Sequence, residues 1–490
     1  MRYFIFILSL LISVATLGQQ ATYTRIYSGS SYDEGIAAFR LPNKEIRLIG
    51  NTGSFGHGNT DVWLIALDSI GNFLWHKFYG GTNIERVEDA VMTSNGNIFM
   101  VGSTTQNTAA SYQIYFLGVD PYGQIIAYNN YGGKDWELGH GIALITDSTF
   151  VLTGESYSYG NGQSDIYLLK LNQNGDTLWT KTYGGVSEER GNAIKLMPDN
   201  GFIVVGATKS FGNGTFDSYL IRLNPNGDTL WTKVRSHISD AEYYSMTINI
   251  NTDTSIVCVG YQNDTLNAYR DVDIVSYDQY SNFIWSRANS LTEGEECYIN
   301  SIFTDDNGEY IYCGITNKYS ASQYSNIRLA RLSSLGWWQS SVSIGEEKEE
   351  VPNAVSPDNF NGKHYFLIGT TKSYGVERSG VFFVRLDSNF NYDTTGMLET
   401  PTLISQYEQN QLIKVFPNPA RDYLNIDFSD INENGVLQIV NMLGEIIITD
   451  NIAANTRRLK LPIANLEIGA YVLRFQSPKF LFQQQFVRMK

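Results

Sequence analysis

The segment SDIYLLKLNQNGDTLWTKTYGG, residues 164–185, is one copy of a unit that repeats along the chain. Three further copies keep the same register at steps of 52 residues, and they occupy residues 60–81, 112–133 and 216–234. Three looser copies follow, anchored at Asp273, Asn326 and Gly380. Self-similarity at a period near 50 is typical of repeat architectures, in which each copy is one supersecondary unit.

Each copy contains four short β-rich stretches separated by turn signals. In one copy the stretches are residues 192–197, 202–207, 217–223 and 229–234. Four such strands predict a four-stranded antiparallel sheet. A sheet of this size cannot bury both of its faces alone, so the copies must pack face to face, and radial packing of four-stranded sheets is a β-propeller. We therefore expect an all-β fold built on a propeller.

The number of copies predicts seven blades. The seventh copy loses its pattern after Leu386, before a fourth strand, whereas TYTRIYSG at residues 22–29 matches the fourth-strand ending TKTYGG. We therefore expect the N-terminal strand to complete the last blade, which removes a sheet edge. The predicted division of the chain is a signal peptide at 1–18, a propeller at 19–391, a linker at 392–411 and a C-terminal domain at 412–490.

The repeat also resembles a known group of proteins. SYGNGQSD at residues 158–165, followed by LNQNGDTLWTKTYGG, is similar to propeller repeats that are common in secreted proteins of Bacteroidetes-type bacteria. The resemblance covers roughly residues 22–391. It implies the fold and is nearly silent on function, because one fold carries many functions.

The N-terminal segment and the net charge indicate where the protein is located and which partners it can bind. Residues 1–18, MRYFIFILSLLISVATLG, combine a positive start, an apolar run and small residues, which predicts a secretory signal peptide. No other stretch is apolar enough to cross a bilayer, so we expect no transmembrane segment in the mature chain. The net charge of −15 argues against nucleic acid as a partner, since phosphate binding needs a basic surface.

A different pattern begins with VFPNPARDYLNIDF at residues 415–428. Together with the later motifs it resembles the type A C-terminal sorting domain of the type IX secretion system, and we interpret it as a small β-sandwich. The resemblance implies the type IX secretion machinery as a partner and a mature protein that is secreted or attached to the outer-membrane surface. The residues that carry the motif are Pro417, Asn418, Pro419, Leu424, Gly444, Gly469, Tyr471 and Lys490.

The most regular ionisable feature is a carboxylate at the start of the first strand of each blade. A ring of such groups at one channel mouth can hold a hard cation such as Ca²⁺ or accept hydrogen bonds from sugar hydroxyls. The alternative is that each carboxylate accepts hydrogen bonds that lock the blades together, and repetition in every blade favours this alternative. The residues are Asp33, Glu85, Glu137, Glu189, Glu242, Glu296 and Glu350.

Signals for catalysis are sparse. The five histidines form no metal-binding spacing, and neither a nucleophile elbow nor a phosphate loop is present, so no catalytic residue is assigned. No cofactor is predicted apart from the calcium alternative.

The chain has three cysteines, Cys258, Cys297 and Cys313, so at least one thiol stays outside any disulfide. A Cys297–Cys313 bridge is one alternative. The favoured interpretation is that the cysteines are small buried side chains in strands.

Three classes of function remain open. The leading one is non-enzymatic binding of a glycan or a surface protein through loops on one face, where aromatic residues such as Tyr157, Tyr159, Phe211 and Tyr374 can stack on sugars. The second is a polysaccharide hydrolase or lyase that uses carboxylates from different blades. The third is a structural component of the cell surface.

Overall fold

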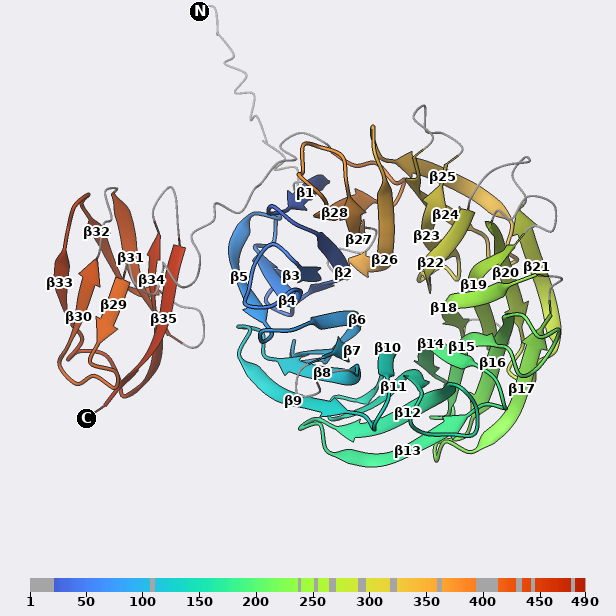
Figure 1. Cartoon of the computed structure of the whole chain (residues 1–490). Coiled ribbons are helices and arrows are strands. Elements are labelled where there is room, and N and C mark those ends of the chain that lie inside the picture. The colour runs from blue at the N-terminus through green and yellow to red at the C-terminus, as the bar shows by residue number, and fades with distance from the viewer. Residues whose placement is uncertain are drawn as a thin grey trace, which may run out of the picture. The chain divides into compact units, whose positions relative to one another are not determined.

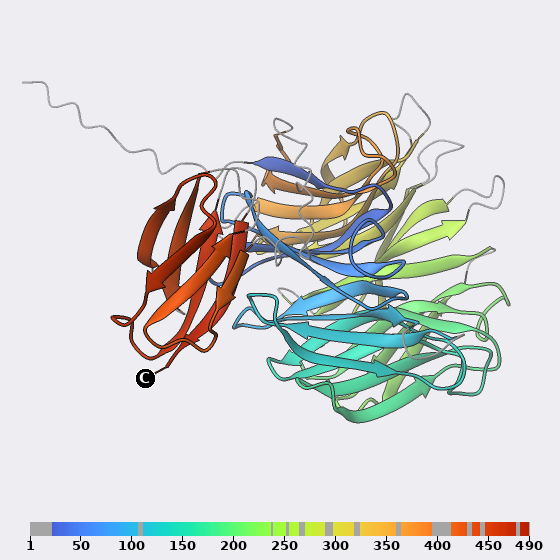
Figure 2. The ribbon, with the colours of Figure 1, turned by 60° about the vertical axis from the view of Figure 1, so that its left-hand side comes forward.

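The computed structural model divides into two compact units, residues 1–399 and 400–490 (Figures 1 and 2). Throughout the part of the chain that it describes, the secondary structure is β-strand and turn, with no helix. The described residues are 22–105, 111–236, 239–250, 254–263, 270–289, 297–317, 324–358, 364–393, 413–428, 434–441, 446–476 and 481–489.

The first unit consists of four-stranded antiparallel sheets. From first to fourth strand they are β2 (Asp33–Arg40), β3 (Ile46–Thr52), β4 (Asp61–Leu67) and β5 (Phe73–Tyr79); β6 (Glu85–Met92), β7 (Ile98–Thr104), β8 (Gln113–Val119) and β9 (Ile125–Tyr131); β10 (Glu137–Thr146), β11 (Thr149–Ser156), β12 (Asp165–Asn172) and β13 (Thr177–Tyr183); β14 (Glu189–Leu196), β15 (Phe202–Thr208), β16 (Asp217–Leu223) and β17 (Thr229–Arg235); β18 (Ala241–Asn249), β19 (Ser255–Asn263), β20 (Arg270–Tyr277) and β21 (Phe283–Asn289); β22 (Cys297–Thr304), β23 (Tyr310–Thr316), β24 (Asn326–Leu332) and β25 (Trp338–Ile344); β26 (Glu350–Asp358), β27 (His364–Thr371), β28 (Gly380–Asp387) and β1 (Tyr23–Tyr27).

The sheets stand around one centre, and the first strand of each sheet lies nearest to it (Figure 1). This arrangement is typical of a β-propeller and confirms the prediction of repeated four-stranded sheets. The middle strands are the most buried: β7 and β15 are buried along their whole length, whereas the outer strand β13 alternates between exposed and half-buried positions. Burial on both faces explains why the middle strands are nearly continuous apolar runs.

The turn before each outer strand follows from its sequence. In the turn between β12 and β13, the side-chain oxygen of Asn172 accepts hydrogen bonds from the N–H groups of Asn174 and Asp176, both at 2.9 Å. Gly175 adopts a φ of 85°, a left-handed conformation that glycine enters without a steric penalty. The Asn-x-Asn-Gly-Asp sequence therefore closes this hairpin by itself.

The last sheet of the first unit combines three strands from the end of that unit, β26, β27 and β28, with the N-terminal strand β1, which lies at its edge. β1 pairs antiparallel with β28, so Tyr23 to Tyr27 form the fourth strand of the last sheet. Next to this junction, Asp358 of β26 forms ion pairs with Arg40 of β2 and with Arg385 of β28, and all three side chains are at least 96 % buried. The ion pair with Arg40 joins the last sheet to the first.

Hydrogen bonds from side chains of the outer strands to backbone carbonyls join neighbouring sheets. The Tyr183 hydroxyl, in the YGG segment, donates a hydrogen bond of 2.5 Å to the carbonyl of Gly227 in the outer turn of the next sheet. Side chains at related places in other outer strands also donate to a carbonyl of the next sheet's outer turn. These pairs are Tyr79 to Gly123, Tyr131 to Gly175, Trp231 to Gln279, Arg287 to Gly336 and Arg25 to Gly71.

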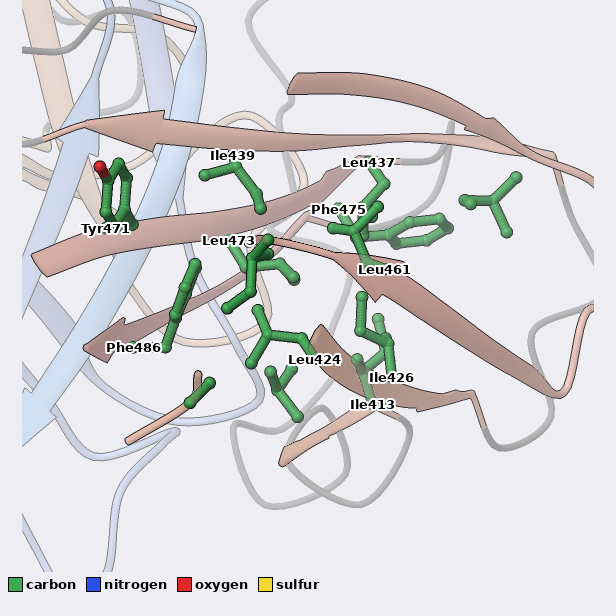
Figure 3. Packing of buried hydrophobic residues seen from close by; sticks show 14 of the residues in the cluster. Ile413, Leu424, Ile426, Leu437, Ile439, Leu461, Tyr471, Leu473, Phe475 and Phe486 are labelled. Carbon is green, nitrogen blue, oxygen red and sulfur yellow. The ribbon is translucent and has the colours of Figure 1, made fainter. Parts of the chain in front are cut away.

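The second unit contains two antiparallel sheets that share one hydrophobic core (Figure 3). Leu424 and Ile426 of one sheet and Leu437, Leu473 and Phe475 of the other belong to this core. One sheet has the order β29 (Ile413–Phe416), β30 (Tyr423–Phe428) and β33 (Arg458–Pro462), and the other has the order β32 (Ile446–Ile452), β31 (Gly435–Asn441), β34 (Gly469–Gln476) and β35 (Leu481–Arg488).

The three cysteines form no disulfide and are buried in strands. This confirms the favoured prediction over a Cys297–Cys313 bridge. Burial raises the pKa of the Cys258 thiol and of the Cys313 thiol, so both remain protonated and unreactive at neutral pH. A separate finding concerns membranes: within the described ranges, no helix has the length and apolar character needed to cross a bilayer.

Candidate functional site

Five of the predicted carboxylates begin the innermost strand of their sheet and are fully buried. At Glu189, Oε1 accepts hydrogen bonds from Thr208 Oγ1 at 2.7 Å and from the Ser210 N–H at 2.9 Å, and Oε2 accepts one from the Gly185 N–H at 2.7 Å. These donors lie in the neighbouring strand, in the loop after it and in the connection from the preceding sheet. The carboxylate therefore holds that connection against its own sheet.

The same arrangement recurs at the other four positions. A hydroxyl of the second strand and a backbone N–H of the preceding connection donate to the carboxylate each time. The hydroxyl and N–H donors are Thr52 and Gly29 for Asp33, Thr104 and Gly81 for Glu85, Ser156 and Gly133 for Glu137, and Thr371 and Glu346 for Glu350. Burial raises the pKa of Asp33 and of Glu350, and these hydrogen bonds offset part of that rise.

Glu242 does not occupy the equivalent position. The residue that begins its innermost strand, opposite Gln262, is Ala241, and in the next sheet Cys297 stands opposite Thr316. Glu242 comes one residue later and therefore points to the other face of the strand, where it pairs with Arg190 at 3.4 Å. A step of 52 residues from Glu189 leads to Ala241, so the one-residue error came from choosing the nearest carboxylate instead of keeping the spacing. Glu296 lies outside the described residues.

The aspartate at the start of the third strand caps its own loop. Asp165 Oδ2 accepts hydrogen bonds from the N–H groups of Asn161 and Gly162, both at 2.9 Å. A Cβ on Gly184 would lie 2.0 Å from Asp165 Oδ1, which explains the first glycine of the YGG motif. Nowhere in the described part of the chain do three or more His, Cys, Asp or Glu side chains group as metal ligands would. Calcium and ligand binding by the carboxylate ring stay predictions.

The innermost strands share a second feature, a β-bulge at their fourth residue. The pairing register shifts at this point in every one of these strands. A bulge re-aims the side chain that it carries and is common beside functional sites. Three of the bulge residues are asparagine and the other four differ; in chain order they are Ile36, Glu88, His140, Asn192, Tyr244, Asn300 and Asn353.

Where the bulge residue is asparagine, it joins two sheets. Asn192, Asn300 and Asn353 donate hydrogen bonds of 2.8, 2.6 and 2.7 Å to carbonyl oxygens of the next innermost strand. Glu88 of β6 and His140 of β10 replace this amide with ionisable groups in two adjacent sheets. The structural device is therefore interrupted there.

Glu88 and His140 line a pocket of about 310 Å³ between β6 and β10. Its other lining residues are Thr60, Ile84, Arg86, Ser103, Tyr112 and Leu138. The pocket combines hydroxyl, cationic, anionic and imidazole groups with apolar walls. This composition suits a small polar ligand that also presents apolar surface.

The charges in and around the pocket are paired. Arg86 contacts Glu88 at 2.6 Å and Glu34 at 3.1 Å, and its side chain remains 46 % exposed. His140 Nε2 lies 3.6 Å from Glu155 Oε1, beyond hydrogen-bond distance, and the two groups form an ion pair when the imidazole is protonated. Burial disfavours the charged imidazole, but the carboxylates of Glu155, Glu88 and Glu242 outweigh it and raise the pKa of His140.

Aromatic side chains flank the same pocket. The ring of Trp136 packs edge-on against Tyr112 at 5.7 Å and against Tyr157 at 6.2 Å between centroids. Trp136 is 48 % exposed and Tyr157 is 40 % exposed, so both present free ring surface. The positions equivalent to Trp136 in other sheets hold Tyr32, Ile84, Glu188, Asp240 and Glu349.

The other aromatic residues predicted for ligand stacking differ among themselves. Tyr159 and Phe211 are exposed, and each packs one ring face toward a tyrosine of its own sheet. Tyr374 is half-buried and stacks parallel to Phe382 at 5.8 Å, so its expected exposure was wrong. The pocket residues were missed because the sequence comparison followed what repeats. Their signal is the opposite one: positions two and four of the first strand vary among the copies, whereas position one is a carboxylate in five of them.

The described residues of the predicted sorting motif lie at structural positions of the second unit. Asn418 Oδ1 accepts a hydrogen bond of 3.0 Å from the Val487 N–H, which fastens the FPNP segment to the last strand. Leu424 is fully buried, and Tyr471 stacks on Phe486 (Figure 3). Pro417 and Pro419 flank Asn418, and Gly469 begins β34, whereas Gly444 and Lys490 lie outside the described residues.

Two family matches cover parts of the chain. Residues 414–488 match the secretion system C-terminal sorting domain. Residues 147–177 and 198–229 match a β-propeller domain of unknown function, DUF5122. The second match falls on the two most regular copies of the repeat.

Solved structures with a similar chain trace include other propellers. The β-propeller domain of the Trilobed protease from Pyrococcus furiosus has 7 % identity, with 77 % of this chain and 99 % of that chain covered and a TM-score of 0.42. The α-L-arabinanase of Penicillium chrysogenum has 10 % identity, 75 % and 98 % coverage and a TM-score of 0.43. Likeness at this level carries no inference about activity or ligand. No curated protein matches this chain.

The sorting domain implies interaction with the type IX secretion machinery. Proteins that carry it are directed across the outer membrane. The chain therefore combines β-propeller repeats with a type IX secretion C-terminal sorting domain, and it is a secreted or outer-membrane surface-attached protein.

Proposed function

We propose that this protein is a non-enzymatic recognition protein, which binds a glycan or a surface protein through loops at one end of its propeller. The observation that carries this proposal is the exposed aromatic group around Trp136 beside the pocket that Arg86, Glu88 and His140 help to line. Structural contacts repeat from sheet to sheet, whereas the position of Trp136 holds residues other than tryptophan in the other sheets where this position is described.

The proposal includes an architecture. The four-stranded sheets of the first unit are the seven blades of a propeller that β1 closes, and the two sheets of the second unit form a sandwich around their shared core. Residues 1–18 are a signal peptide and residues 392–411 a linker, so that the propeller spans 19–391 and the sorting domain 412–490. In this scheme the sandwich directs the protein to the secretion machinery, and the propeller performs its function outside the cell.

A glycan array tests the recognition proposal, with the full chain applied at pH 6 and pH 8, with and without calcium. We expect binding to a restricted set of glycans. A correctly folded chain that binds none of them would contradict glycan recognition and leave a protein partner or a structural role. Glycan binding that requires calcium would instead support a ligand site at the buried carboxylates.

A hydrolase or lyase is the second candidate, and one observation favours it. His140, whose pKa is raised, stands beside Glu155 and near Glu88, so an acid and a base are both present at the pocket. Incubation of each bound oligosaccharide with the protein, followed by chromatography of the products, separates the two functions. Intact oligosaccharide after prolonged incubation supports recognition, and shorter or unsaturated products support the enzyme.

A further inference from the structure

We propose that the pocket between β6 and β10 is a binding site for one uncharged sugar residue of a glycan, with the sugar ring stacked on Trp136. This inference rests on the proposed recognition function and names its site and its ligand class. It follows from three observations: the exposed Trp136 packs against Tyr112, which lines the pocket; the charges of the pocket are paired; and Trp136, Glu88 and His140 differ from the residues at the equivalent positions that the structure describes.

The aromatic wall supplies the apolar contact. Trp136 is held edge-on between Tyr112 and Tyr157, so its orientation is fixed before a ligand arrives. Rigid aromatic side chains provide contact area at a small cost in conformational entropy. One face of a pyranose ring carries axial C–H groups and forms an apolar surface of the same size as an indole ring.

The paired charges supply hydrogen bonds without net positive charge. Arg86 is neutralised by Glu34 and Glu88, and His140 faces Glu155. Three carboxylates thus accompany the Arg86 guanidinium and the His140 imidazole, and an anionic sugar finds no unpaired cation among these groups to compensate its carboxylate. Sugar hydroxyls, in contrast, both donate and accept, so they can bind Arg86 as acceptors and Glu88 as donors.

The location of the pocket explains how a repeated fold acquires one site. Glu88 and His140 stand on bulges that carry an interlocking asparagine in three other sheets. Trp136 occupies a position that is acidic, aliphatic or a lone tyrosine in the other sheets whose residue is described. The loss of one structural contact and the gain of aromatic surface therefore coincide in adjacent sheets.

Isothermal titration calorimetry tests the inference with the full chain and paired oligosaccharides. The probes are gluco-, galacto-, manno-, xylo- and arabino-oligosaccharides, each neutral hexose series matched by its uronic acid form. We expect a neutral series to bind and its uronic acid form to bind at least tenfold more weakly. Trp136→Ala and Glu88→Gln should each weaken binding at least tenfold, because one removes the stacking surface and the other an acceptor of sugar hydroxyls.

Trp337→Ala is the matched control, since Trp337 is 60 % exposed and lies in the turn before β25, in a different sheet. It should leave affinity unchanged. Neutral glycan binding that survives both pocket substitutions would overturn this site while recognition stands. Preference for the uronic acid form would overturn the ligand class. Binding of no probe, with the fold confirmed by circular dichroism, would overturn this inference, and the wider glycan array then decides the proposed function separately.

Discussion

The first residue and the fourth residue of the innermost strands behave in opposite ways. At the first position, five sheets carry a buried carboxylate with the same donors, as Glu137 and Glu189 illustrate. At the fourth position, the bulge residue is asparagine in three sheets and varies in the other four, and two of these variants, Glu88 and His140, open onto a pocket. The difference teaches that repetition here indicates architecture, whereas variation indicates the place where a ligand can be recognised.

A substitution that breaks the ion pairs at the closure of the ring should give the largest loss of stability. In Asp358→Asn, the buried guanidinium groups of Arg40 and Arg385 lose their carboxylate. Removing one partner of a buried ion pair costs about 3–5 kcal/mol of unfolding free energy. All eight tryptophans lie in the first unit, so tryptophan fluorescence during urea denaturation reports on that unit.

The control for this substitution is Glu188→Gln. Glu188 pairs with Lys209 at 3.0 Å, and both side chains are 30 % exposed. A solvent-screened pair contributes less than about 1 kcal/mol. Equal shifts of the denaturation midpoint in the two variants would show that the buried triad has no special role in closing the ring.

The repeated carboxylates come next. Glu189→Gln keeps the shape of the side chain but replaces one acceptor oxygen with an NH₂ group that faces a donor, either the Gly185 N–H or the Thr208 hydroxyl. We expect a loss of about 1–3 kcal/mol, the range for an unsatisfied buried polar group. Urea denaturation measures it. An unchanged midpoint would argue against the structural role of this position and return it to the candidates for ligand binding.

A smaller effect is expected at the contacts between outer strands. Tyr183→Phe removes only the hydroxyl that donates to the Gly227 carbonyl. One such hydrogen bond contributes about 0.5–1.5 kcal/mol. Tyr159→Phe, with a hydroxyl on an exposed residue, is the comparison and should change stability less. Reversal of that order would show that the YGG tyrosine is conserved in the repeat for packing alone.

The smallest expected effect on stability comes from the loss of the proton of His140 as pH rises. Its pKa is raised in the folded protein, so the ion pair with Glu155 contributes stability below the ordinary pKa near 6.5 and loses it as pH rises through the raised value. A partly exposed pair is worth less than about 1 kcal/mol. NMR titration, with the signal assigned through His140→Gln, should give a lower pKa in Glu155→Gln. The same pKa in both proteins would contradict this pairing.

The sequence predicted the sheets because the period, the turns and the apolar strands agree with one another. The 52-residue step also located the buried carboxylates of the regular copies, and a further step of 52 from Glu189 leads to Ala241, where the next innermost strand begins. The prediction of Glu242 failed because it followed the nearest carboxylate rather than the spacing. The pocket could not be predicted in this way, because Trp136, Glu88 and His140 are departures from the repeat. Their proximity depends on how two sheets pack, which no spacing along the chain expresses.

The central claim is that the varied positions bind a ligand and that the repeated carboxylates support the fold. The most direct test measures the affinity of one glycan identified on the array for three proteins: the unaltered chain, Trp136→Ala and Glu189→Gln, at a temperature at which all are folded. The account predicts at least tenfold weaker binding for Trp136→Ala and unchanged binding for Glu189→Gln. Unchanged binding for Trp136→Ala together with loss for Glu189→Gln would contradict it and place the site at the carboxylate ring.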